Sequence, residues 1–163
     1  MSRKTGKLLF AGIILLSLPY LAMATLKGSG FLDLCKGGLS AQVVEAIQAG
    51  ADVNARDEFG NTPLHMAAGC NEDPEVVISL VEAGANVNAR NTGGQTPLLR
   101  AARYNPNPEV TEALLNEGAD PVIGDNDRRT PGYYAGSNEK LKGTSLHTLL
   151  YDAADGFAEL CKT

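Results

Sequence analysis

Short apolar stripes recur along the chain in the same order and at the same spacing. One stripe comprises Val76, Val77, Leu80 and Val81, and the next comprises Val110, Leu114 and Leu115. Steps of three and four residues place such side chains on one face of an α-helix. Each stripe opens with Pro-Glu-Val, and a shorter segment that begins Thr-Pro-Leu precedes it. The pattern therefore predicts pairs of short helices and an all-α fold.

The starts and stops of these helices recur every 34 residues, as Gly50, Gly84 and Gly118 show. A Thr hydroxyl can cap the first turn, and Pro suits that turn because its missing N–H would have no partner there. Gly readily adopts the left-handed backbone that ends a helix. A period of this length indicates stacked units instead of one globular core. The positions expected to be structural are Gly50, Thr62, Pro63, Gly84, Thr96, Pro97, Gly118, Thr130 and Pro131.

The period divides residues 25–163 into four units within one repeat domain. They are a capping unit at about 30–57, full repeats at about 58–91 and 92–125, and a degenerate closing unit at about 126–155. In the closing unit, Arg128 stands where the repeats have Gly60 and Gly94, so a glycine-type backbone is expected at Arg128. Degenerate end units are expected in a stack, because their outer faces contact water.

Residues 1–24 have the pattern of a secretory signal peptide. A basic start containing Arg3 and Lys4 precedes the apolar run 8–21, and Ala22-Met23-Ala24 supplies small residues for cleavage. The alternative is an uncleaved membrane anchor, but the run is shorter than the roughly 20 apolar residues that span a bilayer. We expect export, cleavage after Ala24, a periplasmic location and contact with the membrane only through the leader.

Export changes how the three cysteines are interpreted, because disulfides persist outside the cytosol. Cys35 and Cys70 are separated by nearly one period, so a disulfide between them is the candidate bridge. The alternative is two small buried side chains. Cys161 lies two repeats beyond Cys70 and outside the reach of a disulfide from either residue.

Charge and the scarcity of reactive side chains exclude several functions. The net charge of −5 disfavours nucleic acid and anionic lipid and fits a basic protein surface better. His65 and His147 are the only histidines, and the cysteines lack the close spacing of a zinc site. No sequence context of a nucleophilic triad or a phosphate-binding loop is present. We therefore expect no enzyme, no cofactor, no metal and no small-molecule substrate.

The repeated segments resemble the ankyrin repeat family. The matching residues are Thr62-Pro63-Leu64-His65-x-Ala67-Ala68, Glu75-Val76-Val77 and Leu80-Val81-x-x-Gly84-Ala85-x-Val87-Asn88, with the same frame one period later. The chain as a whole is similar to small exported bacterial ankyrin proteins. The resemblance implies a solenoid of helix–turn–helix units with projecting hairpin loops, a structural role for His65, protein–protein recognition and no cofactor. Leu99 and Tyr133 replace that histidine in the next two units.

The resemblance also implies which surfaces contact a partner, namely the hairpin tips and the concave side of each first helix. Arg100, Arg103 and Tyr104 lie at i, i+3 and i+4 and share one helix face. Arg and Tyr are enriched in binding hot spots, although long side chains also cover ordinary solvated faces. The full candidate set is Phe59, Met66, Arg90, Arg100, Arg103, Tyr104 and Tyr134.

These features together favour a non-catalytic module that binds a folded partner protein in the bacterial periplasm or envelope. Two more specific roles stay open. One is an inhibitor or immunity-type protein that masks a toxic envelope enzyme, and the other is a stabilising factor for a periplasmic enzyme. Partner choice resides in variable surface positions, which carry no code that identifies the partner.

Overall fold

Helices alone make up the regular structure of the described part of the chain. The computed structural model describes residues 29–160, so the predicted leader at 1–24 and Cys161 lie outside the described residues. Within them there are eight helices and no strand, which confirms the all-α prediction. None of the described helices has the length and apolar character needed to cross a membrane.

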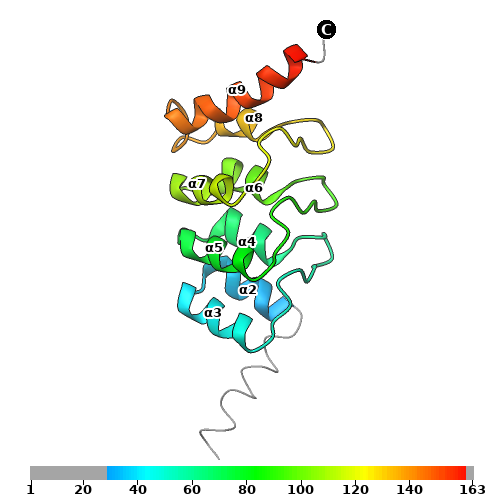
Figure 1. Cartoon of the computed structure of the whole chain (residues 1–163), viewed down its shortest axis with the longest axis vertical. Helices are drawn as coiled ribbons and strands as arrows, with labels where there is room; N and C mark the ends of the chain where they lie inside the picture. The colour runs from blue at the N-terminus through cyan, green and yellow to red at the C-terminus, as the bar shows by residue number, and fades with distance from the viewer. Residues whose placement is uncertain (1–28, 161–163) are drawn as a thin grey trace, which may run out of the picture.

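The helices form two layers that run along a single stack (Figure 1). The first layer holds α2 (Ser29–Gly37), α4 (Pro63–Cys70), α6 (Pro97–Tyr104) and α8 (Pro131–Ala135). The second holds α3 (Ser40–Gln48), α5 (Pro74–Glu82) and α7 (Pro108–Asn116), and α9 (Ser145–Leu160) closes the stack against α8. Each helix contacts the helix of the same layer in the next unit. Loops between units project to one side of the stack (Figure 1).

The helix starts follow the sequence prediction. Thr62 and Thr96 precede α4 and α6, and their hydroxyls accept hydrogen bonds from the backbone N–H groups three residues later. Thr130 precedes α8 but makes no side-chain cap. In the second layer, Asp73 and Asn107 cap α5 and α7, and a proline occupies the first turn. These caps satisfy N–H groups that lack a partner inside the helix.

Left-handed backbone recurs at the two positions predicted for it. Gly50, Gly84 and Gly118 have φ of 88°, 93° and 87° directly after the second-layer helices. Gly60 and Gly94, at the hairpin tips, both have φ of 73°. Arg128 has φ of 63° at the equivalent tip, so the expected glycine-type backbone is present in a residue with a Cβ. That conformation is strained for an arginine.

Small alanines bring the first-layer helices together around the core. Ala67, Ala68, Ala101 and Ala102 are fully buried. Of the leucines and valines predicted on the apolar stripes, Val76, Val77, Leu80, Val110 and Leu114 are inaccessible to solvent, while Val81 and Leu115 are partly buried against them. A side chain no larger than a methyl group allows close approach between helices, so each unit buries its apolar face against its neighbours.

A ladder of buried asparagines links each unit to the one before it, and the sequence reasoning missed it. The Nδ2 of Asn105 donates to the carbonyls of Ala68 and Asn71, at 2.9 and 2.8 Å. Asn71 donates in the same way to Cys35 and Gly38, and Asn138 to Ala102 and Asn105. These amides satisfy carbonyls at the ends of the first-layer helices, which have no partner inside the helix.

The closing unit differs because α8 has only five residues. Gly132 lies directly beneath α9, and a Cβ on it would come within 2.6 Å of the carbonyl oxygen of Leu150. A leucine at that position, as in the two repeats, could not fit. The missing side chain therefore lets α9 lie across α8 and end the stack.

The structure contradicts the candidate disulfide, since Cys35 and Cys70 are both free thiols. The asparagine ladder explains why. Asn71 contacts Cys35 as Asn105 contacts Ala68, so Cys35 occupies the core position of Ala68. Cys70 is two residues further along its helix, which turns its side chain by about 200°. Cys35 is fully buried while Cys70 is exposed, and burial raises the pKa of Cys35 to about 12.

Candidate partner-binding face

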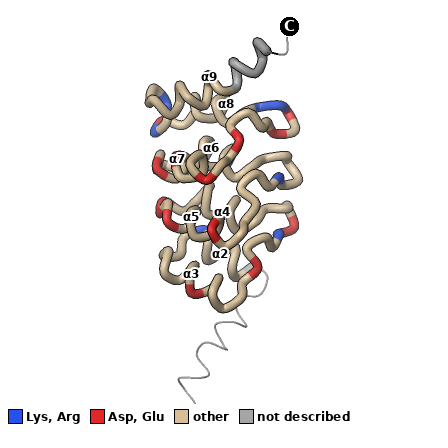
Figure 2. The backbone as a smooth tube through the Cα atoms, in the orientation of Figure 1, with Lys and Arg blue, Asp and Glu red and all other residues tan. Residues whose placement is uncertain are grey.

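Charged residues are unevenly divided between the second layer and helices α4, α6 and α8 of the first (Figure 2), while α2 carries one acid and one base, Asp33 and Lys36. Helices α3, α5 and α7 carry acids and no base, namely Glu45, Glu75, Glu82, Glu109 and Glu112. Helices α4, α6 and α8 carry no acid and two bases, Arg100 and Arg103. An acidic chain thus has two arginines on a first-layer helix.

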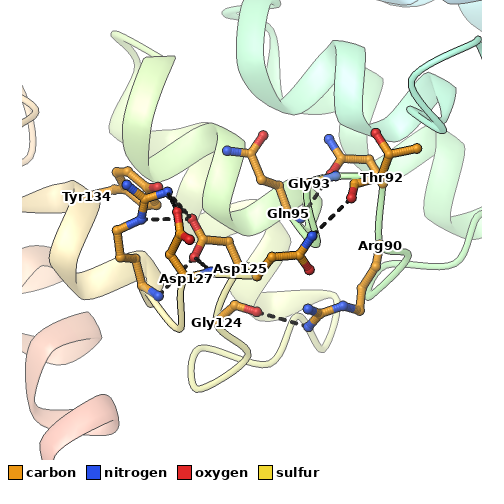
Figure 3. Close-up of polar contacts among 11 residues, drawn as sticks. Arg90, Thr92, Gly93, Gln95, Gly124, Asp125, Asp127 and Tyr134 are labelled. Carbon is orange, nitrogen blue, oxygen red and sulfur yellow. Dashed lines mark hydrogen bonds and ion pairs between the residues drawn. The ribbon is translucent and has the colours of Figure 1, made fainter.

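Neighbouring hairpin loops are joined by a continuous set of hydrogen bonds. The backbone N–H and the hydroxyl of Thr92 both donate to the carbonyl of Phe59. One period later, Asn126 donates from its backbone to Gly93 and from its Nδ2 to the carbonyl of Thr92 (Figure 3). Each tip is therefore held in position by the next, although the loops contain no regular structure.

Arg90 takes part in this loop network. Its Nη1 donates to the carbonyl of Gly124 in the next loop, at 2.9 Å (Figure 3). Arg56 makes the equivalent bond to the carbonyl of Arg90, one repeat earlier. The interpretation of Arg90 as a partner contact is therefore revised, because its guanidinium holds two loops together.

Phe59 differs from Arg90, because its ring takes no part in the network. Asp57 accepts hydrogen bonds from the backbone N–H groups of Phe59 and Asn61, which shapes the turn. Burial raises the pKa of the Asp57 carboxyl, but these bonds outweigh it and hold that pKa below its ordinary value. The ring of Phe59 is 60% exposed at the tip of the first full hairpin. A rigid backbone thus presents an apolar ring to solvent.

His65 makes one hydrogen bond to the cap of its own helix and one to the second repeat. Its Nδ1 accepts from the backbone N–H of Thr62 at 3.1 Å, and its Nε2 lies 2.9 Å from the carbonyl of Gln95. A carbonyl can only accept, so Nε2 carries the proton and the ring is neutral. Burial lowers the pKa of His65 to about 4, despite the opposing effect of the Gln95 carbonyl.

Tyr134 is buried, so its interpretation as a partner contact is revised. Its hydroxyl donates to Oδ2 of Asp125 at 2.6 Å, and Arg129 pairs with the same oxygen at 3.0 Å (Figure 3). Burial would raise the pKa of Asp125, but the hydrogen bonds from Tyr134 and Arg129 lower it. This cluster stabilises the loop of the closing unit, where Tyr133 stands in place of the histidine and is exposed.

Arg103 contacts two aromatic rings. The carbon at the centre of its guanidinium lies 4.8 Å from the ring centroid of Tyr104 and 4.8 Å from that of Tyr134. Tyr104 is 50% exposed, whereas Tyr134 is buried below the surface. Contacts of this kind attract a cation to a ring face and fix its orientation. Arg103 thus occupies a defined position at the junction of α6 and α8.

Arg100 extends in the opposite direction, over the first repeat. Gly69 lies beneath it, and a Cβ there would come within 3.1 Å of Arg100 Nε. Its Nη1 reaches Asn61 Oδ1 at 3.4 Å, while its buried Nε has no hydrogen-bond partner. Met66, one period earlier on α4, is half-buried. We call Arg100, Arg103 and Tyr104 the α6 face.

A family model described as Ankyrin repeats (3 copies) matches residues 32–125 and 68–159. The chain belongs to the ankyrin repeat family. Membership indicates a protein–protein interaction module of a family that is typically non-catalytic. A search of curated proteins finds no match.

The candidate residues of this ankyrin repeat protein fall into three groups. Arg100, Arg103 and Tyr104 lie together on one exposed helix face. Phe59 lies apart from them, at a loop tip. Met66 adjoins the face as a half-buried side chain, while Arg90 and Tyr134 hold loops together. The family pattern indicates which positions face outward but not which side chains bond across repeats. It therefore does not distinguish Arg90 and Tyr134 from the residues of the α6 face.

The described part of the ankyrin stack contains an open groove but no cluster of metal-binding side chains. No three His, Cys, Asp or Glu side chains lie close enough there to hold a metal ion. An open groove of about 320 Å³ between α7 and α9 is lined by Leu115, Leu146 and Leu149, and Glu112 is its only titratable group. That lining suits apolar contact and lacks the acid–base pair that a hydrolytic site would need.

Proposed function

We propose that this ankyrin repeat protein binds a folded partner protein through the α6 face, with Phe59 as a second contact at the loop tips. The orientation of Arg103 against two tyrosine rings carries the proposal. Among the arginines of the described residues, Arg56 and Arg90 donate hydrogen bonds to carbonyls of the next loop, and Arg129 donates to Asp125 in its own loop. Arg103 is fixed in position and makes no such bond.

Physical reasons favour this face over the rest of the surface. Binding costs entropy for each long side chain that becomes ordered, at roughly 0.5–1.5 kcal/mol. Contacts with two rings restrict Arg103 in the free protein, so less of that entropy remains to be lost on binding. Arg and Tyr dominate binding hot spots, and here both occur on one rigid helix. The stack beneath them provides a surface that does not need to rearrange.

We also propose that the protein acts in the periplasm or envelope, on the basis of its first 24 residues. Mass spectrometry of the protein from a periplasmic extract tests this directly. We expect a mature chain that begins at Thr25. Recovery of the intact chain from the membrane fraction would instead support an anchor.

An affinity capture from intact periplasm tests the binding face. The bait is the native chain, compared with a variant that carries Arg100→Ala, Arg103→Glu and Tyr104→Ala. We expect one abundant partner on the native chain and its loss on the variant. Equal capture by both chains would contradict the assignment of the α6 face.

A matched control carries Glu82→Ala, Glu109→Ala and Glu112→Ala, three exposed changes on the second layer. We expect this control to retain the partner, and circular dichroism should show that all three chains are folded. The activity of the captured protein, measured with and without the ankyrin chain, then distinguishes an inhibitor from a stabilising factor.

A further inference from the structure

We infer that the partner segment that binds the α6 face is acidic, and that Arg100 and Arg103 bind its carboxylates. This inference rests on the proposed function and specifies the chemistry of the partner. The net charge of the whole chain favours a basic surface instead. The distribution of charges within the structure reverses that expectation for this face.

The first observation is that neither arginine of the α6 face forms an ion pair with a described residue. Across residues 30–153, the ion pairs are those of Arg129 with Asp125 and Asp127. The first-layer helices α4, α6 and α8 contain no acid. The charge of Arg100 acts on the Asp57 carboxyl of the first hairpin, and Asn61 contacts both side chains. Arg103 therefore supplies most of the uncompensated positive charge of this face, and exposed charges further away are screened over about 10 Å at 0.1 M salt.

The second observation is the direction in which Arg103 can bind. The guanidinium of Arg103 lies over the Tyr104 and Tyr134 rings at equal distances, and its side chain is exposed, so a partner can reach its N–H edge. That edge is a planar fork of donors that matches a carboxylate in bidentate geometry. In the described part of the structure Arg103 donates no hydrogen bond, so these donors have no protein acceptor.

The third observation is that Arg100 is incompletely paired. Its one hydrogen bond is the long contact to Asn61, and its Nε is buried without an acceptor. A buried donor that lacks an acceptor is unfavourable, because it has lost water without replacement. Its guanidinium lies 5.7 Å from the Tyr104 ring, so one acidic segment crossing Tyr104 could approach both arginines.

Nuclear magnetic resonance of the arginine Nε–Hε groups tests this chemistry even for weak binding. The purified protein is titrated with a peptide of alternating Gly and Glu, and separately with the same peptide carrying Gln for Glu. We expect the Glu peptide to shift the signals of Arg100 and Arg103 more than those of Arg56 and Arg90. The Gln peptide should shift none of them.

Two charge-neutralising variants sharpen the titration. Arg103→Gln should weaken binding of the Glu peptide by about tenfold, the effect of losing one charge-assisted pair. Lys142→Gln removes the same charge from an exposed position that follows α8, and it should leave the affinity unchanged. If both variants weakened the binding of the Glu peptide equally, the net charge of the protein would explain the effect, and the inference would be overturned.

Other outcomes would also overturn it. Equal shifts with the Glu and Gln peptides would exclude carboxylate recognition. Tighter binding of inorganic phosphate than of the Glu peptide would identify a phosphate-bearing partner instead. A chain that captures its partner through Tyr104 yet shows no response to the Glu peptide contradicts the acidic assignment alone. Capture that survives the triple variant contradicts the proposed function itself.

Discussion

The two full repeats have the same frame and different surfaces. Helices α4 and α6 share the Thr cap, the first-turn Pro, a buried Leu and the Ala-Ala pair. Met66, Gly69 and Cys70 of the first repeat correspond to Arg100, Arg103 and Tyr104 of the second. Gly69 is covered by Arg100 and Met66 is half-buried, whereas Arg103 and Tyr104 are exposed, so the second repeat places larger polar side chains on this face without altering the shared core residues. Recognition can therefore be placed on one repeat without a change in the fold.

The repeats also differ at one buried position. His65 joins its own cap to the next loop by hydrogen bonds, whereas Leu99 fills the equivalent place with an apolar side chain. One junction is therefore polar and sensitive to protonation, and the next is not. Both repeats contain the asparagine ladder, and each of its amides satisfies two buried carbonyls. We therefore expect the ladder to contribute more to stability than the side chain of His65 or Leu99.

The largest effect is expected from breaking the shared ladder with Asn105→Ala. The change leaves the carbonyls of Ala68 and Asn71 buried and unpaired, which costs about 1–3 kcal/mol for each group. We expect a loss of about 2–4 kcal/mol in the free energy of unfolding. Urea denaturation measures it. Asn116→Ala, an exposed change at the end of α7, should cost less than about 0.5 kcal/mol.

Replacing His65 with leucine makes the first repeat copy the second. The pKa of His65 is lowered to about 4 in the folded state, against about 6.5 when unfolded. The unfolded chain binds the extra proton, so native stability is lost as pH falls from about 6.5 to 4. A shift of this size corresponds to about 3 kcal/mol.

Urea denaturation at pH 7 and pH 4.5 measures this contribution. At pH 7, His65→Leu should be less stable than the native chain, because Thr62 and Gln95 lose their partner. Between the two pH values the variant should lose less stability than the native chain. An identical loss in both would show that His65 does not titrate as described.

Much of the frame could be predicted from the sequence, because it depends on local chemistry that repeats. The caps at Thr62 and Thr96 and the glycine-type backbone at Arg128 all follow from a residue and its immediate neighbours. The ladder could not be predicted from Asn105 alone, since an asparagine before a proline is also typical of a turn. The recurrence of asparagine at Asn71 and Asn138 was the signal that could have revealed it.

The candidate face was predicted less completely than the frame. Exposure of Arg103 and Tyr104 follows from helix periodicity. The burial of Tyr134 depends on Asp125, nine residues away, and the role of Arg90 depends on a carbonyl in the next repeat. Such contacts between units are fixed by the stack and not by the local pattern.

A smaller effect is expected where the closing unit departs from both repeats. Arg128→Gly restores the residue that Gly60 and Gly94 supply at the same left-handed turn. We expect a gain of about 0.5–1 kcal/mol, since the strain of a Cβ at positive φ is removed. Thermal unfolding should show a midpoint a few degrees higher. A lower midpoint would mean that Arg128 makes stabilising contacts that outweigh the strain.

The smallest effect concerns Cys70, which occupies the place of Tyr104 in the first repeat. In a Cys161→Ser background, Cys70 should react with iodoacetamide in the native state, and Cys35 only in denaturant. The unfolding midpoint should be the same with and without reductant. If neither thiol reacted until reductant was added, a disulfide between Cys35 and Cys70 would be present, contrary to the structure.

The contrast between the two repeats leads to one direct measurement. A photocrosslinking amino acid is placed at Tyr104 on the α6 face, or at Glu82 on the second layer, in the protein made by living cells. We predict one heterologous crosslinked product from position 104 and none from position 82. Crosslinks from both positions, or from position 82 alone, would contradict the claim that the second repeat carries the binding face.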